Sequence, residues 1–424
     1  MKKFLALLLA VLMLASVLVA CGGGDKKDSG KSDSGKSSDS GDPFNGEDNI
    51  KLLVWAPDKA IDLTKELCEE FKKQYSDKTI DITVQVQSES EAATQALNDK
   101  DAAADVFGFA SDQFNKLMTA NALAPIFSPD EIIERNSEKS ISAATGADGN
   151  LYAYPETDDN GYFLVYDKSV ITHTDTIEGI LDDCRKAGMK FVMDAGNGYY
   201  ACVFAFTGGL TLDGLEEDGT QKFNNYNEEE VVDSLEAFAT LFHDYKDVFL
   251  SSEVAKIPTG MAAKPQIVAA GIDGTWDTVA IQEALGDNYG AAKLPTIKVK
   301  GTDKPMISLH GYKLMGVNAV TKFPYASQLL ADFLTNEESQ IKRAKDLGWG
   351  PSNNKAKEDS AVADSPAISA VLAQSDNSVA QVNMSDAFWS PMNTLGNTLW
   401  KDKDYSRATI QKNFEKTIAS IKGE

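Results

Sequence analysis

The sequence predicts an α/β fold in which helices cover a largely parallel sheet. Between residues 50 and 109 the hydrophobic pattern alternates strand, helix, strand, helix and strand, an order that is typical of such sheets. The chain has 424 residues, which is long enough for two domains with a sizeable core. A hydrophobic content of 42% and a charged content of 25% are ordinary for a soluble globular protein.

The first part of this pattern can be assigned element by element. Residues 50–55 form an apolar run that predicts a buried strand. Large apolar residues recur every four positions over residues 63–75, which predicts an amphipathic helix. Residues 80–86 alternate apolar and polar side chains and predict a second strand. A second helix is expected at residues 89–98 and a third strand at residues 104–109.

The remainder of the chain repeats strands and helices with polar turns between them. Turns rich in glycine and polar residues before residue 162 suggest a connection between two lobes. The acidic stretch 213–219 lacks the alternating oxygen ligands and the terminal Glu of a calcium loop, so we expect a hairpin turn there. Further strands are expected at 162–166, 190–193, 266–272 and 312–318, and further helices at 231–242 and 324–334.

The N-terminus has the pattern of an exported lipoprotein. Two lysines precede an apolar run from Phe4 to Ala20, which predicts a secretory signal peptide at residues 1–20. A membrane-spanning helix is disfavoured because the run is short for a bilayer. Ala20 directly before Cys21 resembles the bacterial lipoprotein box, and that resemblance implies cleavage before Cys21 and a diacylglyceryl thioether on its sulfur.

A polar segment follows the predicted lipidation site. Residues 22–46 consist mainly of Gly, Ser, Asp and Lys, which cannot bury enough apolar surface to fold. We therefore assign residues 21–46 to a lipidated cysteine and a flexible linker. A lipid at one end and a folded body at the other predict a protein held at a membrane surface, outside the bilayer.

Charge and cysteine usage exclude several classes of partner. The formal net charge is −23, which disfavours nucleic acid. Cys68, Cys184 and Cys202 are widely spaced, with no CxxC, so they predict neither a disulfide framework nor a zinc site. Each is expected to be a small buried side chain, and no metal or cofactor is expected.

The sequence gives little support to catalysis. It contains no HExxH, GxSxG, Walker A or helix-opening GxGxxG motif. His173, His243 and His310 lie far apart in sequence, and each is expected at the surface or satisfied by hydrogen bonds. Carboxylates are abundant, so counting them does not exclude a glycosidase pair, although no pair stands in a context that singles it out. Binding without bond cleavage is therefore favoured.

Aromatic and polar residues gather where predicted strands and turns end. Ligands of parallel sheets bind beyond the carboxyl ends of strands, so such residues are candidates for a site. A flat ring surrounded by short polar groups suits a sugar, although a ring buried in the core is the alternative for each. The candidates after strands and turns are Trp55, Asp58, Lys59, Phe109, Asp112, Gln113, Asn197, Tyr199, Trp276 and Trp389. Trp349 and Trp400 are assigned to the core.

Short stretches of the chain resemble the maltose/maltodextrin-binding proteins. These belong to family 1 of the extracellular solute-binding proteins that serve ABC transporters. Residues 53–59 resemble the family's first strand with its sugar-contacting Asp-Lys pair, here Asp58 and Lys59. Residues 105–113 resemble the stretch that places Trp, Asp and Arg against the sugar, with Phe109 for the Trp and Gln113 for the Arg.

The resemblance continues through the second half of the chain. Residues 150–155 match the run into the family's first hinge, after which a carboxylate contacts ligand; Asp159 is the candidate here, with Glu156 behind it. Residues 197–199 resemble the family's Glu-Pro-Tyr, with Asn197 in place of Glu, and residues 274–276 resemble its Gly-Pro-Trp. Residues 384–389 resemble Met-Ser-Ala-Phe-Trp with Asp386 inserted, and its role is open between holding a hydroxyl and capping the next helix.

The resemblance implies a two-lobed periplasmic-binding-protein-like fold of type II with the ligand between the lobes. An N-terminal lobe is expected at residues 47–157 and 312–352, and a C-terminal lobe at 158–311 and 353–424. Chain crossings are expected near residues 157–161, 308–312 and 352–356.

The function implied is a monomeric, lipid-anchored protein that captures a carbohydrate, expected to be a malto-oligosaccharide, and delivers it to an ABC transporter permease. One alternative is a surface-anchored glycoside hydrolase or glycan-tethering protein. Another is the same fold binding a non-sugar solute such as a polyamine, which would suit the acidic charge.

Overall fold

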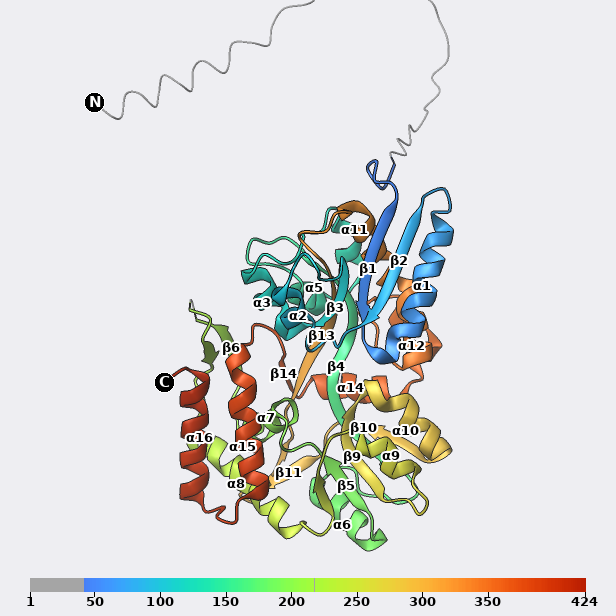
Figure 1. The fold of residues 1–424 in the computed structure, drawn as a ribbon. Helices are drawn as coiled ribbons and strands as arrows, with labels where there is room; N and C mark the ends of the chain where they lie inside the picture. The colour runs from blue at the N-terminus through green and yellow to red at the C-terminus, as the bar shows by residue number, and fades with distance from the viewer. Residues whose placement is uncertain (1–41, 217) are drawn as a thin grey trace, which may run out of the picture. The chain divides into compact units, whose positions relative to one another are not determined.

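The computed structural model describes residues 42–216 and 218–424. The predicted signal peptide, Cys21 and most of the predicted linker lie outside these residues. The described chain is built on a ten-stranded sheet with the order β2-β1-β3-β13-β4-β9-β5-β8, to which β10 is added beside β4 and β14 beside β13 (Figure 1). The predicted α/β class is confirmed, and parallel pairs form both ends of the sheet.

The N-terminal lobe contains the first strands and the helices around them. The spacing that predicted its first helix is confirmed, because that helix buries Leu63, Leu67 and Phe71 on one face. Its elements are β1 (Ile50–Ala56), α1 (Ile61–Gln74), β2 (Ile80–Val86), α2 (Ala92–Asn98), β3 (Val106–Ala110), α3 (Phe114–Thr119), α4 (Asp130–Arg135), α5 (Glu138–Ala143), α11 (Pro324–Leu334) and α12 (Glu337–Leu347).

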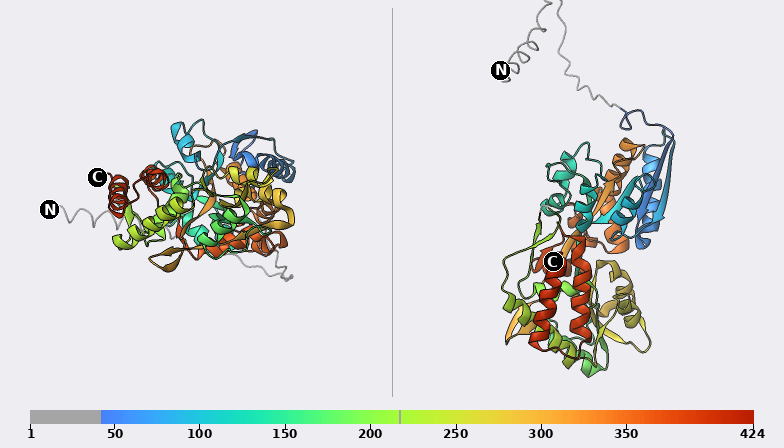
Figure 2. Two further views of the ribbon diagram at one scale, coloured as in Figure 1. Left: turned by 90° about the horizontal axis from the view of Figure 1, so that it is seen from below. Right: turned by 60° about the vertical axis from the view of Figure 1, so that its left-hand side comes forward.

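The C-terminal lobe contains the middle of the chain and its end. Its elements are α6 (Ile177–Ala187), β5 (Lys190–Met193), α7 (Gly198–Phe206), β6 (Leu212–Leu215), β7 (Gln221–Phe223), α8 (Glu228–Asp244), β8 (Phe249–Ser251), α9 (Lys256–Ala262), β9 (Val268–Gly274), α10 (Thr278–Leu285), β10 (Tyr289–Ala292), β11 (Thr296–Val299), β12 (Thr302–Pro305), α14 (Pro366–Ser375), β14 (Ser378–Ala380), α15 (Trp389–Lys401) and α16 (Arg407–Ile421). Helices α15 and α16 pack side by side along one flank (Figures 1 and 2).

Several short elements complete the chain. The hairpin turn expected at residues 213–219 is confirmed, since β6 and β7 pair in antiparallel fashion. Helix α13 (Ser360–Ala363) precedes α14, and six 3-10 turns occupy the ends of larger elements. These turns are η1 (Asp58–Ala60), η2 (Ser111–Gln113), η3 (Thr275–Asp277), η4 (Gly286–Asn288), η5 (Ala356–Glu358) and η6 (Asp386–Phe388).

Two long strands connect the lobes. Strand β4 (Ala153–Asp167) and strand β13 (Ser308–Val317) pair antiparallel, with Met315 opposite Tyr154 and His310 opposite Gly161. The turns expected before residue 162 are therefore wrong: this polar stretch is the middle of one continuous strand. Figure 1 shows both strands running from one lobe into the other. The register shifts around residues 311–313, which marks an irregularity where the chain crosses between lobes.

Each lobe has its own hydrophobic core. The core of the N-terminal lobe uses buried residues from 44–154 and 312–334. The main core of the C-terminal lobe uses residues from 162–309 and 379–421. Residues 155–161 and 310–311 belong to neither core, so the lobes are joined by backbone pairing with little shared apolar packing at these positions.

The three cysteines beyond the N-terminal segment behave as expected. Cys68, Cys184 and Cys202 are buried and unpaired, and burial raises the pKa of each thiol to about 12. Within residues 42–216 and 218–424 there is no cluster of three or more His, Cys, Asp or Glu side chains suited to a metal ion. In the same part of the chain, no helix has the length and apolar character needed to cross a bilayer.

The start of the folded body differs from the sequence-based boundary. Phe44, assigned to the flexible linker, is fully buried in the core of the N-terminal lobe. Its ring lies 4.9 Å from the ring of Tyr75, and the Lys78 ammonium lies 5.3 Å from its centroid. Lys78 also forms a 2.9 Å ion pair with Asp42. The folded body therefore already includes Asp42 and Phe44, because a buried aromatic side chain and an ion pair attach this polar segment to the core.

We predict that Phe44→Ala lowers the free energy of unfolding by about 3 kcal/mol, because it removes a fully buried ring. Chemical denaturation measures this directly. Phe127→Ala is the matched control, since Phe127 is 49% exposed, and it should cost less than about 1 kcal/mol. A loss below about 0.5 kcal/mol for Phe44→Ala would return residues 42–46 to the linker.

Candidate functional site

A cavity of about 770 Å³ has walls from both lobes. The N-terminal lobe supplies residues of the segment 88–91, the end of β3 and Lys313 of β13. Asn160 comes from the β4 crossing, and Gln381 from the segment directly after β14. The C-terminal lobe supplies Asp194, Asn197, Tyr199, Tyr200, Glu253, Val254, Ala255, Trp276, Trp389 and Asn393. Five residues predicted from the sequence thus meet in one place: Asp112, Asn197, Tyr199, Trp276 and Trp389.

The wall from the C-terminal lobe is aromatic. Tyr199 and Trp276 lie 6.1 Å apart between ring centroids with a tilt of 57°, and each is partly exposed. Trp389 contributes a third ring at the start of α15. The Tyr199 hydroxyl is buried and has no hydrogen-bond partner among the described residues. The wall therefore offers flat apolar faces together with an unused polar group.

Glycines allow these rings to sit against the backbone. A Cβ atom at Gly274 would lie 2.2 Å from Cη2 of Trp276, so the indole ring packs directly over this residue. A Cβ atom at Gly198 would lie 2.8 Å from the Trp389 carbonyl oxygen. The side chain of Asn197 accepts a 3.0 Å hydrogen bond from the Tyr199 amide and caps α7. The absence of a side chain at Gly198 therefore lets the first turns of α7 and α15, which carry Tyr199 and Trp389, lie beside each other.

The opposite wall presents a carboxylate with a raised pKa. Asp112 Oδ1 accepts a 3.1 Å hydrogen bond from Gln381 Nε2. Burial raises the pKa of Asp112 to about 6, with a further contribution from the negative charge of Asp386, while the Gln381 bond acts in the opposite direction. Gln381 Oε1 in turn accepts a 2.9 Å bond from Asn160. This chain of polar groups crosses the floor of the cavity between the lobes.

A second charged group at the cavity was missed from the sequence. Lys313 is 4% exposed, and its ammonium lies 3.4 Å from Glu89 Oε2 and 3.5 Å from the ring centroid of Trp349. Burial raises the pKa of Glu89. A lysine inside an otherwise apolar strand was the available signal, because a charge on a fully buried strand requires a partner. Trp349 is buried, as expected, but it also supports this lysine.

Six predicted residues lie outside the cavity lining: Trp55, Asp58, Lys59, Phe109, Gln113 and Asp159. Phe109 is fully buried in the core of the N-terminal lobe, where its Cε1 would lie 3.0 Å from a Cβ atom at Gly316. Trp55 packs against the same core, 6.0 Å from Phe107. Asp58 is exposed in η1.

Gln113 acts on the local backbone. Its Oε1 accepts a 2.8 Å bond from the Ala93 amide at the start of α2, and its Nε2 donates to the Glu89 carbonyl. Both halves of the side-chain amide are therefore used to hold the segment that carries Glu89. Gln113 thus positions one wall of the cavity.

The carboxylates of the β4 crossing are held by protein groups. Asp159 is fully buried, and its Oδ2 accepts a 2.6 Å bond from the Gly350 amide. Its Oδ1 has no partner among the described residues. Glu156 forms a buried ion pair with Arg343, with 2.7 Å between Oε1 and Nε. Neither carboxylate lines the cavity, and both attach β4 to segments that follow α11.

Two charged pairs connect the lobes at the sides of the cavity. Lys59 donates a 2.7 Å bond to the Trp276 carbonyl oxygen and pairs with Asp277. On the other side, Lys116 of α3 lies 2.7 Å from Asp386. Lys59 thus bridges to the other lobe, and Asp386 has a partner that the sequence did not suggest. Asp386 does not cap the next helix, because α15 has no side-chain cap hydrogen bond; the preceding η6 is capped by Ser385, which accepts from the Ala387 amide.

The fold and the cavity define a two-lobed binding protein whose site has one wall from each lobe. The chain belongs to the bacterial extracellular solute-binding proteins, because the model of this family matches residues 66–370. Comparison with curated protein sequences gives no match.

Solved structures share the fold over most of the chain. One, a complex with acarbose, is 27% identical with a TM-score of 0.78 and covers 88% of this chain and 98% of its own. The maltodextrin-binding protein MalE1 from L. casei BL23 is 24% identical with a TM-score of 0.73, over 88% and 98% of the two chains. MalX from Streptococcus pneumoniae, in complex with maltopentaose, is 19% identical with a TM-score of 0.72, over 88% and 99%.

We predict that Asp386→Ala weakens ligand binding by up to about fivefold at low salt with little change in Tm, because a partly exposed ion pair contributes about 0–1 kcal/mol. The effect should fade in 0.5 M NaCl, since salt screens such pairs. Lys116→Ala should have the same effect, and the double variant should add nothing further. Asp101→Ala is the control, because Asp101 is exposed and forms no ion pair within the described part of the chain. An unchanged affinity in Asp386→Ala at low salt would show that the pair does not stabilise the arrangement of the lobes.

A second prediction concerns Asp273, at the end of β9 beneath the Gly274–Trp276 turn. It is fully buried, its Oδ2 has no described partner, and burial raises the pKa well above the usual value. A carboxyl group with a raised folded-state pKa lowers stability as pH rises above its unfolded value of about 3.9. Asp273→Asn should therefore raise Tm at pH 7 by about 3 °C or more, and the difference should shrink toward pH 4. A difference independent of pH would contradict this assignment.

Proposed function

We propose that this protein is a lipid-anchored carbohydrate-binding protein that captures a malto-oligosaccharide between its lobes and delivers it to an ABC transporter permease. The observation that carries the proposal is the aromatic wall of Tyr199, Trp276 and Trp389 facing the polar wall of Asp112, Glu89 and Lys313 in one cavity. The proposed anchor is the diacylglyceryl thioether on Cys21. The protein is proposed to bind its ligand as a monomer.

The two walls suit the two chemical surfaces of a pyranose. Aromatic faces cover the C–H faces of the sugar rings, while carboxylates, amides and the lysine exchange hydrogen bonds with hydroxyls. Burying a hydroxyl without a partner costs free energy, so a sugar site needs many polar groups close to the rings. The cavity has both kinds.

Known ligands of similar structures support a sugar. The structure that is 27% identical was determined with acarbose, a carbohydrate analogue. Structures at lower identity that share the fold include complexes with maltotetraose and maltotriose. A malto-oligosaccharide is therefore the ligand class that the proposal names, with a binding role rather than cleavage.

The proposed contacts divide into two groups. Those in the cavity are Asp112, Asn197, Tyr199, Trp276 and Trp389, with Glu89 and Lys313 added. The remaining sequence-based candidates, Trp55, Asp58, Lys59, Phe109, Gln113 and Asp159, are proposed to act by supporting the cavity walls or the junction between the lobes. The lobes themselves are proposed to hinge where β4 and β13 leave their respective cores, so that closure buries the sugar.

We predict that calorimetry with maltotriose yields saturable binding and that Trp276→Ala weakens it at least tenfold with little change in Tm. An aromatic ring in contact with ligand contributes about 1.5–3 kcal/mol, which corresponds to roughly 10–150-fold in Kd. Trp400→Phe is the control, because Trp400 packs against Phe242 and Phe249 in the core, and it should leave affinity unchanged.

The same experiment separates binding from hydrolysis. Maltoheptaose incubated with the protein should be recovered intact, whereas a glycoside hydrolase would release shorter products. The absence of any calorimetric or tryptophan-fluorescence response to maltose, maltotriose and maltoheptaose would reject the proposed function.

A further inference from the structure

Three neighbouring strands of the C-terminal lobe end at the cavity between the lobes. Strand β5 lies between β9 and β8 and pairs in parallel with both. Trp276 lies two residues after β9, Asp194 directly after β5, and Glu253 two residues after β8, and all three line the cavity. Adjacent strands lie about 4.8 Å apart, so these strand ends bring an aromatic ring and two carboxylates to one edge of the sheet. We call Asp194 and Glu253 the acidic pair.

The two carboxylates of the acidic pair are close enough to affect each other. The Ser252 amide donates a 3.3 Å hydrogen bond to the Met193 carbonyl oxygen, which joins the two strand ends directly beside both acids. Burial raises the pKa of Asp194, and the negative charge of Glu253 raises it further, while a bond from the Gly196 amide acts in the opposite direction. Two ionised carboxylates are therefore unfavourable at this position.

No basic side chain of the cavity faces the acidic pair. Among the described lining residues only Lys313 is basic, and its ammonium lies 3.4 Å from Glu89 on the opposite wall. Lys256, at the start of α9, is exposed and lies outside the cavity lining. Within residues 42–216 and 218–424, neither Asp194 nor Glu253 forms an ion pair. The protein therefore supplies no neutralising charge here in the part of the chain that the structure describes.

The whole cavity shares this imbalance of charge. Five carboxylates line it against one lysine, namely Glu89, Glu91, Asp112, Asp194 and Glu253. A cleft lined mainly by one sign of charge concentrates its field and attracts the opposite charge. Three aromatic rings in the same lining add to the effect, because the face of such a ring also attracts a cation.

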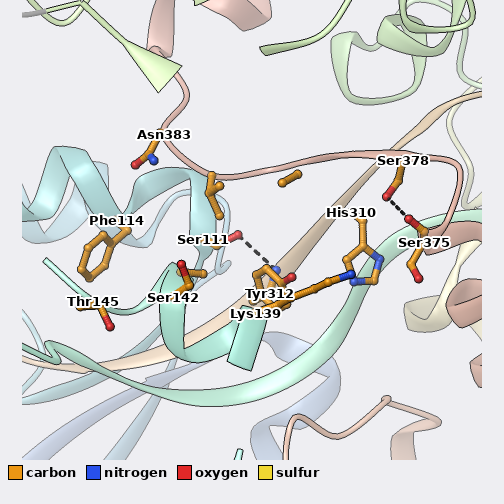
Figure 3. A pocket seen from close by; sticks show the side chains of 13 residues that line it. Ser111, Phe114, Lys139, Ser142, Thr145, His310, Tyr312, Ser375, Ser378 and Asn383 are labelled. Carbon is orange, nitrogen blue, oxygen red and sulfur yellow. Dashed lines mark hydrogen bonds between the residues drawn. The ribbon is translucent and has the colours of Figure 1, made fainter. Parts of the chain in front are cut away.

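The net charge of the chain does not by itself explain this acidity. Figure 3 shows a smaller pocket of about 390 Å³ whose lining includes Lys139 and His310 and no Asp or Glu. A groove of about 460 Å³ beside α8 does collect carboxylates, but Lys298 and Lys300 belong to the same lining, and Lys300 lies 2.7 Å from Glu236. The cavity between the lobes thus differs from both in holding carboxylates with a single lysine.

On the basis of the proposed function, we propose that the saccharide bound in this cavity carries an amine and that its ammonium binds between Asp194 and Glu253. An ammonium has three hydrogen-bond donors, and its charge offsets both carboxylates at once. Trp276 at the neighbouring strand end would cover the sugar ring that bears the amine. A neutral hydroxyl would donate one hydrogen bond and leave the repulsion between the two acids unchanged.

We predict that calorimetry at constant ionic strength gives a lower Kd for an aminated oligosaccharide than for its neutral counterpart. Two matched pairs place the amine at either end of the chain. One compares maltotriitol with maltotriitol aminated at its reduced terminus, and the other compares maltotriose with maltotriose aminated at the primary carbon of its non-reducing glucose. At least one pair should favour the amine by about tenfold, because hydrogen bonds between charged groups are the stronger kind.

The acidic pair should account for this preference. In Asp194→Asn/Glu253→Gln, the ratio of the neutral Kd to the aminated Kd should fall below about threefold. Glu253 is exposed, so Glu253→Gln alone tests the pair without disturbing the core, and it should lower the ratio by about threefold. Asp287→Asn/Glu283→Gln is the matched control, because it removes two exposed charges of the same lobe outside the cavity lining. It should keep the wild-type ratio.

Different results separate this proposal from the proposed function. Equal affinities within both matched pairs would overturn the amine, while maltotriose binding would still support the proposed function. A wild-type ratio in Asp194→Asn/Glu253→Gln would overturn the assignment to the acidic pair. Binding of the aminated compounds without maltotriose would support the acidic pair and reject maltotriose as the ligand. Binding of spermidine without any of the four saccharides would reject both proposals.

Discussion

The pairing of β4 with β13 is the constraint on which the rest of the structure depends. These two strands carry the sheet from one core to the other, so both lobes and the cavity between them are placed by a single set of backbone hydrogen bonds. The polar residues of the crossing are unusual for strands buried in a sheet. Several are held by specific groups, such as Gly350 for Asp159 and Arg343 for Glu156, whereas the Thr157 hydroxyl has no described partner. Charge pairing thus replaces apolar packing where the cores separate.

The aromatic wall could be predicted from the sequence because the features that position its rings are neighbouring residues in the chain. Trp276 lies two residues after a glycine over which its ring packs, and Tyr199 follows a helix-capping Asn and a glycine. Turn chemistry, together with the resemblance of residues 197–199 and 274–276 to family motifs, indicated where these rings would stand. The α/β class followed from hydrophobic period in the same way. These features depend on neighbours a few residues away, which a linear pattern contains.

The polar wall and the lobe junction depended on distant partners and were harder to predict. Lys313 is held by contacts with Glu89 and Trp349, and Lys59 by a hydrogen bond to the turn after β9. Each partner is remote in sequence from its lysine. Phe109 was expected at a ligand because strand ends often carry function, yet pairing with β13 places it in the core. The predicted end of the linker at residue 46 was wrong for a related reason. The average composition of the segment is polar, and it gives no sign that the single Phe44 ring is buried in the core.

The side-chain amide of Gln381 has a further consequence for how the floor of the cavity is held. Its oxygen accepts from Asn160 while its nitrogen donates to Asp112, so the group has a fixed polarity between an amide and an acid. A glutamate of the same shape would oppose two negative charges, and a methionine of similar length would leave both partners unsatisfied. One amide orientation is therefore favoured. In the reversed orientation, the Gln381 nitrogen would face the Asn160 donor, and its oxygen would face the Asp112 acceptor.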